Sequence, residues 1–335
     1  MKARIHTLII IVVTLVALFY IGAFFAADNT KYHNDFTRIL PPHAAEEFKA
    51  IELTDRISLA GLDNGNFYVR YGDSIAAISY DMLDTCKVPV KNPNSYEVSI
   101  DSPYFVIQDG MASFLQHGYI TGWDLDTSIL ELPSYTAAQQ ISDNAAILQV
   151  IDLDLRKNIF IKTNRPGIRA DILKKQVDGI FCTDGFLLFS RKENTLVYPY
   201  RYRNEVICMD TNLNVRRRFR TIDTTTVAKI KVAETGGKIV MSKPPFVVNK
   251  GAWVDGENLF VQSNLAARNE SAVDFNHSTV LDVYNIKEGA YKFSFYIPNR
   301  DNRKLESFKV KDTILIAKFA HWVVRYDLAR EYLKR

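Results

Sequence analysis

Apolar and polar residues alternate most regularly in residues 279–298, where two such segments follow each other. The second segment places Tyr291, Phe293, Phe295 and Ile297 on one side and Lys292, Ser294 and Tyr296 on the other. Because side chains of a β-strand alternate with a period of two, this pattern predicts a strand with one buried and one partly wet face. Residues 287–289, Lys-Glu-Gly, predict the turn of an antiparallel hairpin.

A shorter pattern recurs along the chain: an apolar strand closes on a large residue, and Asp or Asn follows. It ends at Asp81, Asp124, Asp210, Asn285 and Asp327, with spacings of 43, 86, 75 and 42 residues. Asp and Asn suit this place because their side chains accept a backbone hydrogen bond that starts a turn. The spacing of 86 is twice the basic period, so it predicts a hidden third copy, for which residues 158–163 are the candidate.

These copies divide residues 50–335 into six strand-rich units of about 48 residues. A propeller blade of four strands takes ~40 to 50 residues. The sequence therefore predicts an all-β fold, a six-bladed β-propeller, with a pair of β-sandwiches as the main competing architecture.

The two ends of this domain predict how a ring would close. The last unit, residues 304–328, has room for three strands only, and residues 48–53 form a strand without an evident partner. A ring must remove its edges, since an unpaired edge strand invites aggregation. We expect the N-terminal strand to be the fourth strand of the last unit.

Residues 8–27 contain no charged residue and would span ~30 Å as a helix, the thickness of a bilayer core. A cleaved signal peptide has a shorter apolar region, ~7 to 15 residues, with small residues before the cut, where this chain has Phe24 and Phe25. Lys2 and Arg4 precede the run and Asp28 follows it. The pattern favours an uncleaved transmembrane signal-anchor, with residues 1–7 in the cytoplasm and the domain extracytoplasmic, periplasmic in a bacterium.

Composition and charge complete the domain plan. Residues 28–45 are polar and contain Pro41 and Pro42, which predicts a tether before the propeller domain of residues 46–335. With 47% apolar and 24% charged residues the chain has the composition of a globular protein, and a net charge of +4 is too weak to indicate nucleic acid. The fifth unit is too long, and residues 264–278 follow neither period. This segment is either a lid or recognition loop or a tolerated insertion.

Three cysteines bear on the redox compartment. Cys182 and Cys208 fall in one unit and could pair in an oxidising compartment, or they are two separately buried thiols. Cys86 stays unpaired in either case. No Cys-x-x-Cys motif supports redox chemistry.

Motifs for catalysis are lacking in the sequence. The six histidines have no metal-site spacing, and neither a nucleophile elbow nor a phosphate loop occurs. Asp152 and Asp154 share one face of a strand and are residues that calcium prefers, but the stretch lacks the glycine and further acidic residues of a calcium loop. We therefore expect a solvated face there, and no catalytic residue, metal ligand or cofactor is predicted.

The densest basic stretch lies in the fourth unit. As a strand, it places Arg216, Arg218 and Arg220 on one face. The same unit contains Tyr198, Tyr200, Arg201 and Arg203. These seven residues predict a basic and aromatic patch for an acidic partner, lipid head groups or a glycan. The alternative is an outermost strand whose charges prevent pairing with another protein.

Residues 280–298 and 322–328 share a pattern: a strand, Tyr-Asp or Tyr-Asn, a turn, and, in the first of them, Gly and an aromatic strand that ends in Ile-Pro. In this the chain resembles the six-bladed, TolB-like β-propellers of bacterial extracytoplasmic proteins. The resemblance is sharp in the last two units only. It implies a ring with a central channel and a loop face for partners, and it supplies no catalytic motif.

The function predicted from these features is that of a membrane-anchored extracytoplasmic binding or scaffold module at the cell envelope, with a protein, peptide or glycan partner. The alternative is a metal-dependent propeller hydrolase or lyase with its site in the central channel. That enzyme would need three or four Asp, Glu, Asn or His side chains to converge, and Asp109, Asp184 and Asp255 are isolated candidates.

Overall fold

The computed structural model describes residues 13–18, 34–53, 57–89, 97–126, 132–164 and 168–334. Residues 13–18 are helical. The rest of the predicted membrane span, residues 8–27, lies outside the described residues. Within the described part of the chain, no helix is both long and apolar enough to cross a membrane.

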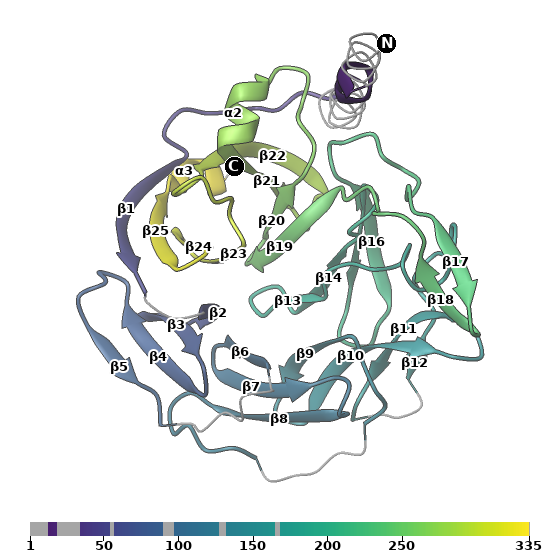
Figure 1. Ribbon diagram of the computed structural model, residues 1–335. Coiled ribbons are helices and arrows are strands. Elements are labelled where there is room, and N and C mark those ends of the chain that lie inside the picture. Colours follow the sequence, from purple (N-terminus) through teal and green to yellow (C-terminus); the bar gives the residue numbers. More distant parts are fainter. Residues whose placement is uncertain are drawn as a thin grey trace, which may run out of the picture.

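Residues 45–328 form a propeller-like arrangement in which small antiparallel sheets surround a common centre (Figure 1). Six units follow one another along the chain. Unit 1 contains β2 (Ile57–Leu62), β3 (Asn66–Tyr71), β4 (Ser74–Ser79) and β5 (Thr85–Lys87); unit 2 contains β6 (Glu97–Asp101), β7 (Tyr104–Asp109) and β8 (Phe114–Tyr119); unit 3 contains β9 (Ala137–Ser142), β10 (Ala145–Asp152), β11 (Lys157–Lys162) and β12 (Arg169–Ala170).

The second half repeats the plan. Unit 4 contains β13 (Leu188–Ser190), β14 (Thr195–Pro199), β15 (Glu205–Met209) and β16 (Val215–Arg220); unit 5 contains β19 (Asn249–Asp255), β20 (Asn258–Ser263), β21 (Ser278–Asn285) and β22 (Ala290–Pro298); unit 6 contains β23 (Ser307–Lys311), β24 (Ile314–Phe319) and β25 (Trp322–Leu328). The first strand of each unit is the innermost one (Figure 1).

The recurring pattern of the sequence marks the third strand of each unit. β4, β8, β15, β21 and β25 carry or precede its Asp or Asn, and the hidden copy, residues 158–163, falls on β11, the third strand of unit 3. The expected turn chemistry is present at Asp210, whose carboxylate accepts from the backbone N–H of Asn212 at 2.9 Å, and at Asn285, which accepts from Lys287 at 2.8 Å. Asp327 differs, because it lies within β25 and pairs with Arg325.

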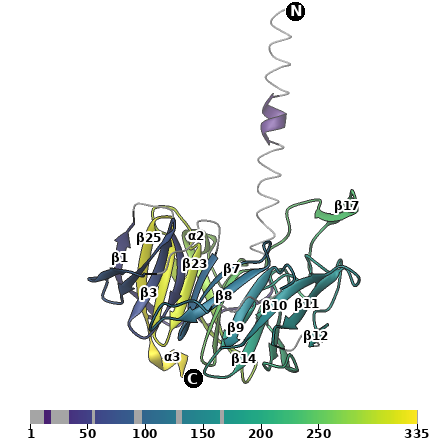
Figure 2. The ribbon, with the colours of Figure 1, turned by 90° about the horizontal axis from the view of Figure 1, so that it is seen from below.

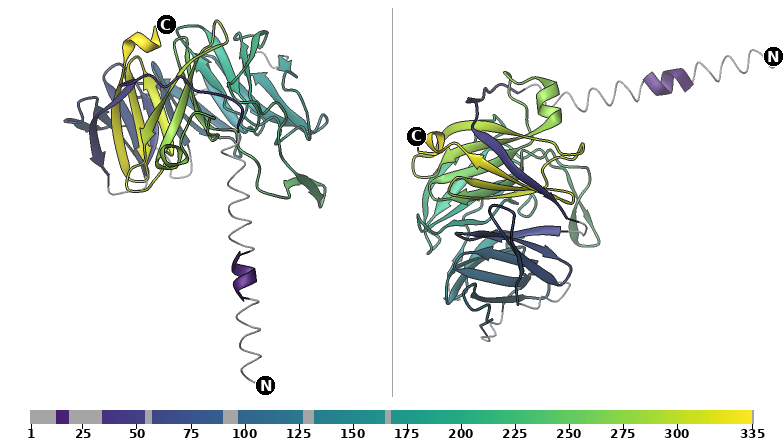
Figure 3. Two further views of the ribbon diagram at one scale, coloured as in Figure 1. Left: turned by 90° about the horizontal axis from the view of Figure 1, so that it is seen from above. Right: turned by 90° about the vertical axis from the view of Figure 1, so that its left-hand side faces the viewer.

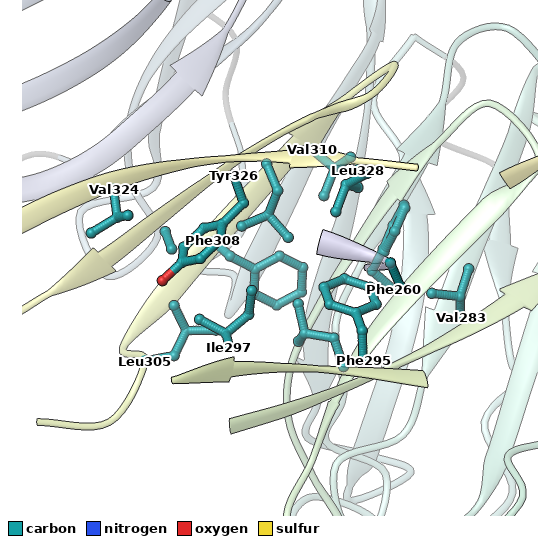
Figure 4. Close-up of a cluster of buried hydrophobic side chains, with 14 of the residues drawn as sticks. Phe260, Val283, Phe295, Ile297, Leu305, Phe308, Val310, Val324, Tyr326 and Leu328 are labelled. Atoms are coloured by element: carbon teal, nitrogen blue, oxygen red, sulfur yellow. The ribbon is translucent and has the colours of Figure 1, made fainter. Parts of the chain in front are cut away.

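Apolar clusters join neighbouring units. Figure 4 shows the largest, in which Phe260 and Phe295 of unit 5 meet Phe308 and Tyr326 of unit 6. Similar clusters lie between units 1 and 2, 2 and 3, 3 and 4, and 4 and 5. Unit 6 also packs on unit 1, where Val323 belongs to one cluster with buried residues of β2 and β3. Burial of these facing surfaces supplies most of the driving force for folding.

β1 (Ala45–Glu52) joins the two ends of the domain. It pairs antiparallel with β25 along its whole length, so the sheet of unit 6 has the order β1-β25-β24-β23. This is the pairing expected of residues 48–53. The backbone N–H of Leu53 extends the contact and donates to the carbonyl of His321 at 2.8 Å.

Units 1 and 2 share one sheet through a parallel pairing of β2 with β6, in which Gly61 lies opposite Ile100. A Cβ at Gly61 would lie only 1.9 Å from the carbonyl oxygen of Ile100. Glycine is therefore required there, because the two backbones approach more closely than any side chain permits.

The hairpin of β21 and β22 confirms the prediction for residues 279–298, with residues 286–289 as its turn. The polar face of β22 is drier than the alternation predicts, since Ser294 is fully buried. The reason is a contact with the N-terminal segment, residues 34–44. The backbone N–H of Ser294 donates to the carbonyl of Ile39 at 2.8 Å, and its hydroxyl donates to Asp282 at 2.5 Å.

Residues 264–278 hold the N-terminal segment, which forms the described part of the predicted tether. Arg268 donates its backbone N–H to the carbonyl of Phe36 at 2.8 Å, and Asn269 exchanges two hydrogen bonds of 2.9 Å with the backbone of Arg38. The loop continues into α2 (Ala272–His277), which Ser271 caps by accepting from the N–H of Asp274. The sequence predicted either a lid or recognition loop or a tolerated insertion here, and neither prediction included a contact with the tether.

A second insertion of unit 5 precedes β19. It contains β17 (Val232–Thr235) and β18 (Lys238–Met241), which form a two-stranded sheet of their own. Figures 2 and 3 show this hairpin on the face of the domain opposite to α3 (Arg330–Leu333). Two insertions thus account for the extra length of unit 5. The sequence indicated the loop of residues 264–278 but not the hairpin of β17 and β18.

The cysteines form no disulfide. Cys182 and Cys208 are separate buried thiols and Cys86 is exposed. Burial raises the pKa of Cys208 to about 12, so this thiol stays protonated and unreactive.

Candidate functional site

The aromatic members of the predicted patch belong to the core. Tyr198 and Tyr200 are fully buried between units 3 and 4. The hydroxyl of Tyr198 donates to the carbonyl of Thr183 at 2.7 Å, and burial raises the pKa of Tyr200 to about 12. The prediction that these two side chains belong to a surface patch is therefore corrected, because β14 is covered on both faces by neighbouring units.

The arginines of that patch separate into buried and exposed ones. Arg203 is fully buried and pairs with Glu205 at 3.0 Å. Arg218 reaches the same carboxylate at 2.6 Å. Arg201 is partly buried and pairs with Asp184 at 2.7 Å. Two carboxylates thus pair with these three cations, and Arg203 and Arg218 share one of them.

Arg216 and Arg220 remain exposed on β16, the outermost strand of unit 4. Arg216 lies 3.7 Å from Asp210. Binding by these two residues stays a prediction, and their placement also agrees with a charged outer strand that resists pairing.

The acidic residues considered for a metal lie apart. Asp109 accepts from the backbone N–H of Met111, Asp184 pairs with Arg201, and Asp255 accepts from the N–H of Asp312. Asp152 pairs with Arg169, and its hydrogen bond from the backbone of Leu155 lowers its pKa. No group of three or more His, Cys, Asp or Glu among the described residues is arranged to hold a metal ion.

Two adjacent hollows form the site that the structure does show. The first, the central hollow, has a volume of about 60 Å³ and lies where five inner strands end. Its lining includes Leu62, Asp101, Arg191, Trp253 and Lys311, from units 1, 2, 4, 5 and 6. The face of the domain that carries it is called the exit face here, since the inner strands end on it.

Arg191 and Asp101 form the ion pair of the central hollow. Arg191 Nε lies 2.9 Å from Asp101 Oδ2, and Nη2 donates to the carbonyl of Gln140 at 2.9 Å. The guanidinium also stacks on the ring of Tyr104, 4.7 Å from its centroid. Burial raises the pKa of Asp101, and Arg191 opposes this effect.

Lys309 of β23 lies beside the central hollow, against Trp253 of its lining. Its Nζ lies 3.9 Å from the ring centroid of Trp253, and the indole N–H is fixed by donating to the carbonyl of Val310 at 2.8 Å. Burial lowers the pKa of Lys309 to about 8, against the attraction of Asp101 and Glu97. Lys309 forms no ion pair with any described residue.

We expect Lys309→Met to raise the free energy of unfolding by about 1–2 kcal/mol at pH 7, because it removes a poorly solvated cation. Between pH 8 and 10.5 the unfolded chain keeps a proton that folded Lys309 has lost. The native protein therefore gains stability relative to the variant as pH rises through this window. Urea unfolding at pH 7 and pH 10 measures the difference, with exposed Lys231→Met as the control. A difference independent of pH would contradict the prediction.

The second hollow, the outer cleft, has a volume of about 650 Å³ and lies beside the first on the exit face. Lys192, Asp255 and Gly256 line both hollows, so the two are adjacent. Lys192 Nζ lies 2.8 Å from Asp312 and 4.0 Å from Asp255. Its hydrogen bond lowers the pKa of Asp312.

The C-terminal helix α3 forms one wall of the outer cleft. Lys292 holds it by donating to the carbonyl of Leu333 at 2.5 Å and to Asn258 at 2.8 Å. The cleft presents charges of both signs, and the full set of charged lining residues is Lys192, Glu193, Asp255, Glu257, Glu288, Lys292, Asp312, Arg330 and Lys334. Such a surface suits a polar ligand that carries both charges.

Sequence reasoning singled out Asp255 as an isolated candidate and missed the other residues of this site. A signal was present, because a charged residue ends or directly follows each inner strand: Asp63, Asp101, Asp143, Arg191, Asp255 and Lys311. The recurring pattern of the sequence lies at the third strands, so it gives no sign of the charged residues at the ends of the first strands.

Comparisons with known proteins add the following. No family model matches the chain, and no curated protein matches it. A solved member of the DUF4221 family from Bacteroides vulgatus has a TM-score of 0.49 at 13% identity, covering 86% of this chain and 99% of that chain. A streptogramin B lyase has a TM-score of 0.48 at 10% identity (85% and 97%), and the Neurospora crassa Pan2 WD40 domain one of 0.44 at 6% identity (87% and 98%). At these scores we base no functional argument on them.

Proposed function

We propose that the protein is a membrane-anchored, extracytoplasmic six-bladed propeller, closed by β1, that acts as a binding or scaffold module at the cell envelope. The uncharged run of residues 8–27 behind Lys2 and Arg4 supports the anchor and its orientation. The pairing of β1 with β25 and the apolar contact between units 6 and 1 support a closed ring.

The position of the N-terminal segment bears on which face is free. Phe36 packs on Val248, directly before the start of β19, and Asn34 donates to the carbonyl of Ala266. The central hollow and the outer cleft lie at the other end of β19, at Asp255. In an anchored protein, the exit face is therefore directed away from the membrane and toward a partner.

The observation that carries the proposal is that the central hollow and the outer cleft adjoin on the exit face, where Lys192, Asp255 and Gly256 line both. Ligand sites are concave, few in number, and equipped with fixed polar groups. We infer that the site binds a polar segment of a partner protein or peptide that bears both charges.

A photoreactive amino acid in place of Glu288, which lines the outer cleft, is expected to form a covalent adduct with a partner in illuminated intact cells. The same substitution at Leu153, which is 82% exposed in unit 3, serves as the control and gives no such adduct. Adding Lys192→Met to the variant at position 288 weakens the adduct, because it removes the cation that lines both hollows. An adduct that forms equally from position 153, or that is unaffected by Lys192→Met, refutes a role of the exit face.

A further inference from the structure

We propose that the central hollow is an oxyanion subsite, which takes a carboxylate or phosphate group of the ligand whose remainder lies in the outer cleft. This inference rests on the proposed function, since it names a chemical group of the ligand bound there. It is carried by the charges around the hollow, by its size and by its position next to the outer cleft.

Positive charge around the hollow exceeds what the protein neutralises. Lys309 and Lys311 lie two residues apart on β23, so they share one face of that strand. Neither forms an ion pair with any described residue. Asp101 is engaged by Arg191 at 2.9 Å, and Glu97, at the start of β6, is the other carboxylate that acts on Lys309. Four cations, Arg191, Lys192, Lys309 and Lys311, thus face three carboxylates, Asp101, Asp255 and Glu97, and Asp101 is already paired with Arg191.

Among the cations around the hollow, Lys309 is the one whose presence is not explained by a contribution to stability. An ammonium removed from water without a partner destabilises the folded state, and a methionine of similar length would fill the same space. Its contact with Trp253 orients the cation but does not neutralise it. An anion entering the hollow would supply the missing counter-charge.

The size of the hollow limits what can enter. The volume of the hollow, about 60 Å³, is about a tenth of that of the outer cleft, so it suits one small end group of a ligand and not a whole ligand. The remainder of a ligand can extend past Lys192 and Asp255 into the outer cleft of about 650 Å³. The indole of Trp253 forms a flat wall of the hollow.

Thermal unfolding of the full-length protein at pH 7, titrated with sodium phosphate and separately with sodium acetate against sodium chloride of equal ionic strength, tests the subsite. We expect a saturable rise in Tm with at least one of the two anions. Saturation by phosphate alone indicates a phosphate group, and saturation by acetate alone indicates a carboxylate. The apparent affinity should fall at least tenfold in Lys309→Met and stay unchanged in Lys231→Met. It should also weaken as pH rises through about 8, where Lys309 loses its charge in the field of Asp101, Glu97, Arg191 and Lys311.

Because Lys309→Met is expected to be more stable than the native protein at pH 7, lost binding in this variant cannot be confused with unfolding. If sodium phosphate and sodium acetate change Tm no more than sodium chloride does, the subsite is refuted. If the rise in Tm saturates at the same anion concentration in Lys309→Met, the bound anion is an adventitious ion only. The adduct from position 288 reports separately on the proposed function. An adduct without an anion effect refutes the subsite alone, whereas absence of both refutes the site as a whole.

Discussion

Replacing Arg38 by alanine should lower the free energy of unfolding by about 3–5 kcal/mol, because it leaves buried carboxylates without their cation. Arg38 Nε and Nη2 donate to the two oxygens of Asp282 at 2.7 and 3.0 Å, and Nη1 pairs with Glu270. The side chains of Arg38 and Glu270 are inaccessible to solvent and that of Asp282 is nearly so. Burial alone would lower the pKa of Arg38, but the two carboxylates raise it above its ordinary value, so the guanidinium stays charged.

Arg268→Ala is the matched control, since it removes an arginine that pairs with Asp35 at 3.3 Å in the same region with both side chains largely exposed. An exposed pair contributes at most about 1 kcal/mol. Urea unfolding of both variants measures the difference. A loss for Arg38→Ala no larger than that of the control would show that the N-terminal segment is a free tether and not part of the folded domain.

Replacing residues 45–52 by a Gly–Ser segment of equal length should abolish cooperative folding of the whole domain. The substitution removes β1, exposes the edge of β25 and weakens the contact between units 6 and 1. The loss is expected to approach the entire stability of an ordinary domain, about 5–15 kcal/mol. Thermal unfolding followed by circular dichroism, together with hydrogen exchange in units 1 and 6, measures it.

The same replacement in residues 232–241 is the control, because β17 and β18 pair only with each other. It should change Tm by a few degrees at most. If loss of β1 merely frayed unit 6 while hydrogen exchange in unit 1 stayed slow, the ring would not depend on the N-terminal strand for its closure.

Much of the fold could be predicted because its signals are local. The alternation in residues 279–298, and the Asp or Asn at or after the third strand of five units, depend only on neighbouring residues and on the period of a strand. Even the degenerate third copy, residues 158–163, was found by spacing, and β11 lies there. The orphan strand in residues 48–53 was assigned correctly because a ring leaves it no other partner.

The predicted basic and aromatic patch shows that burial between units cannot be predicted from local patterns. Tyr198 and Tyr200 belong to a stretch, residues 198–203, in which Tyr alternates with Pro or Arg, yet both are fully buried. Their strand is the second of its unit, where packing by neighbouring units covers both faces. No local pattern distinguishes that position from an exposed one.

The sequence by itself determined the recurring strands, the propeller-like class of the fold and the partner of the N-terminal strand, because these follow from periodicity and from counting. Tertiary structure alone decided which distant side chains meet. Arg38 contacts Asp282 across 244 residues, and Lys309, Trp253 and Asp101 come together from three units. Such contacts depend on the ring bringing its inner strands to one centre, so the candidate site became visible only in the folded chain.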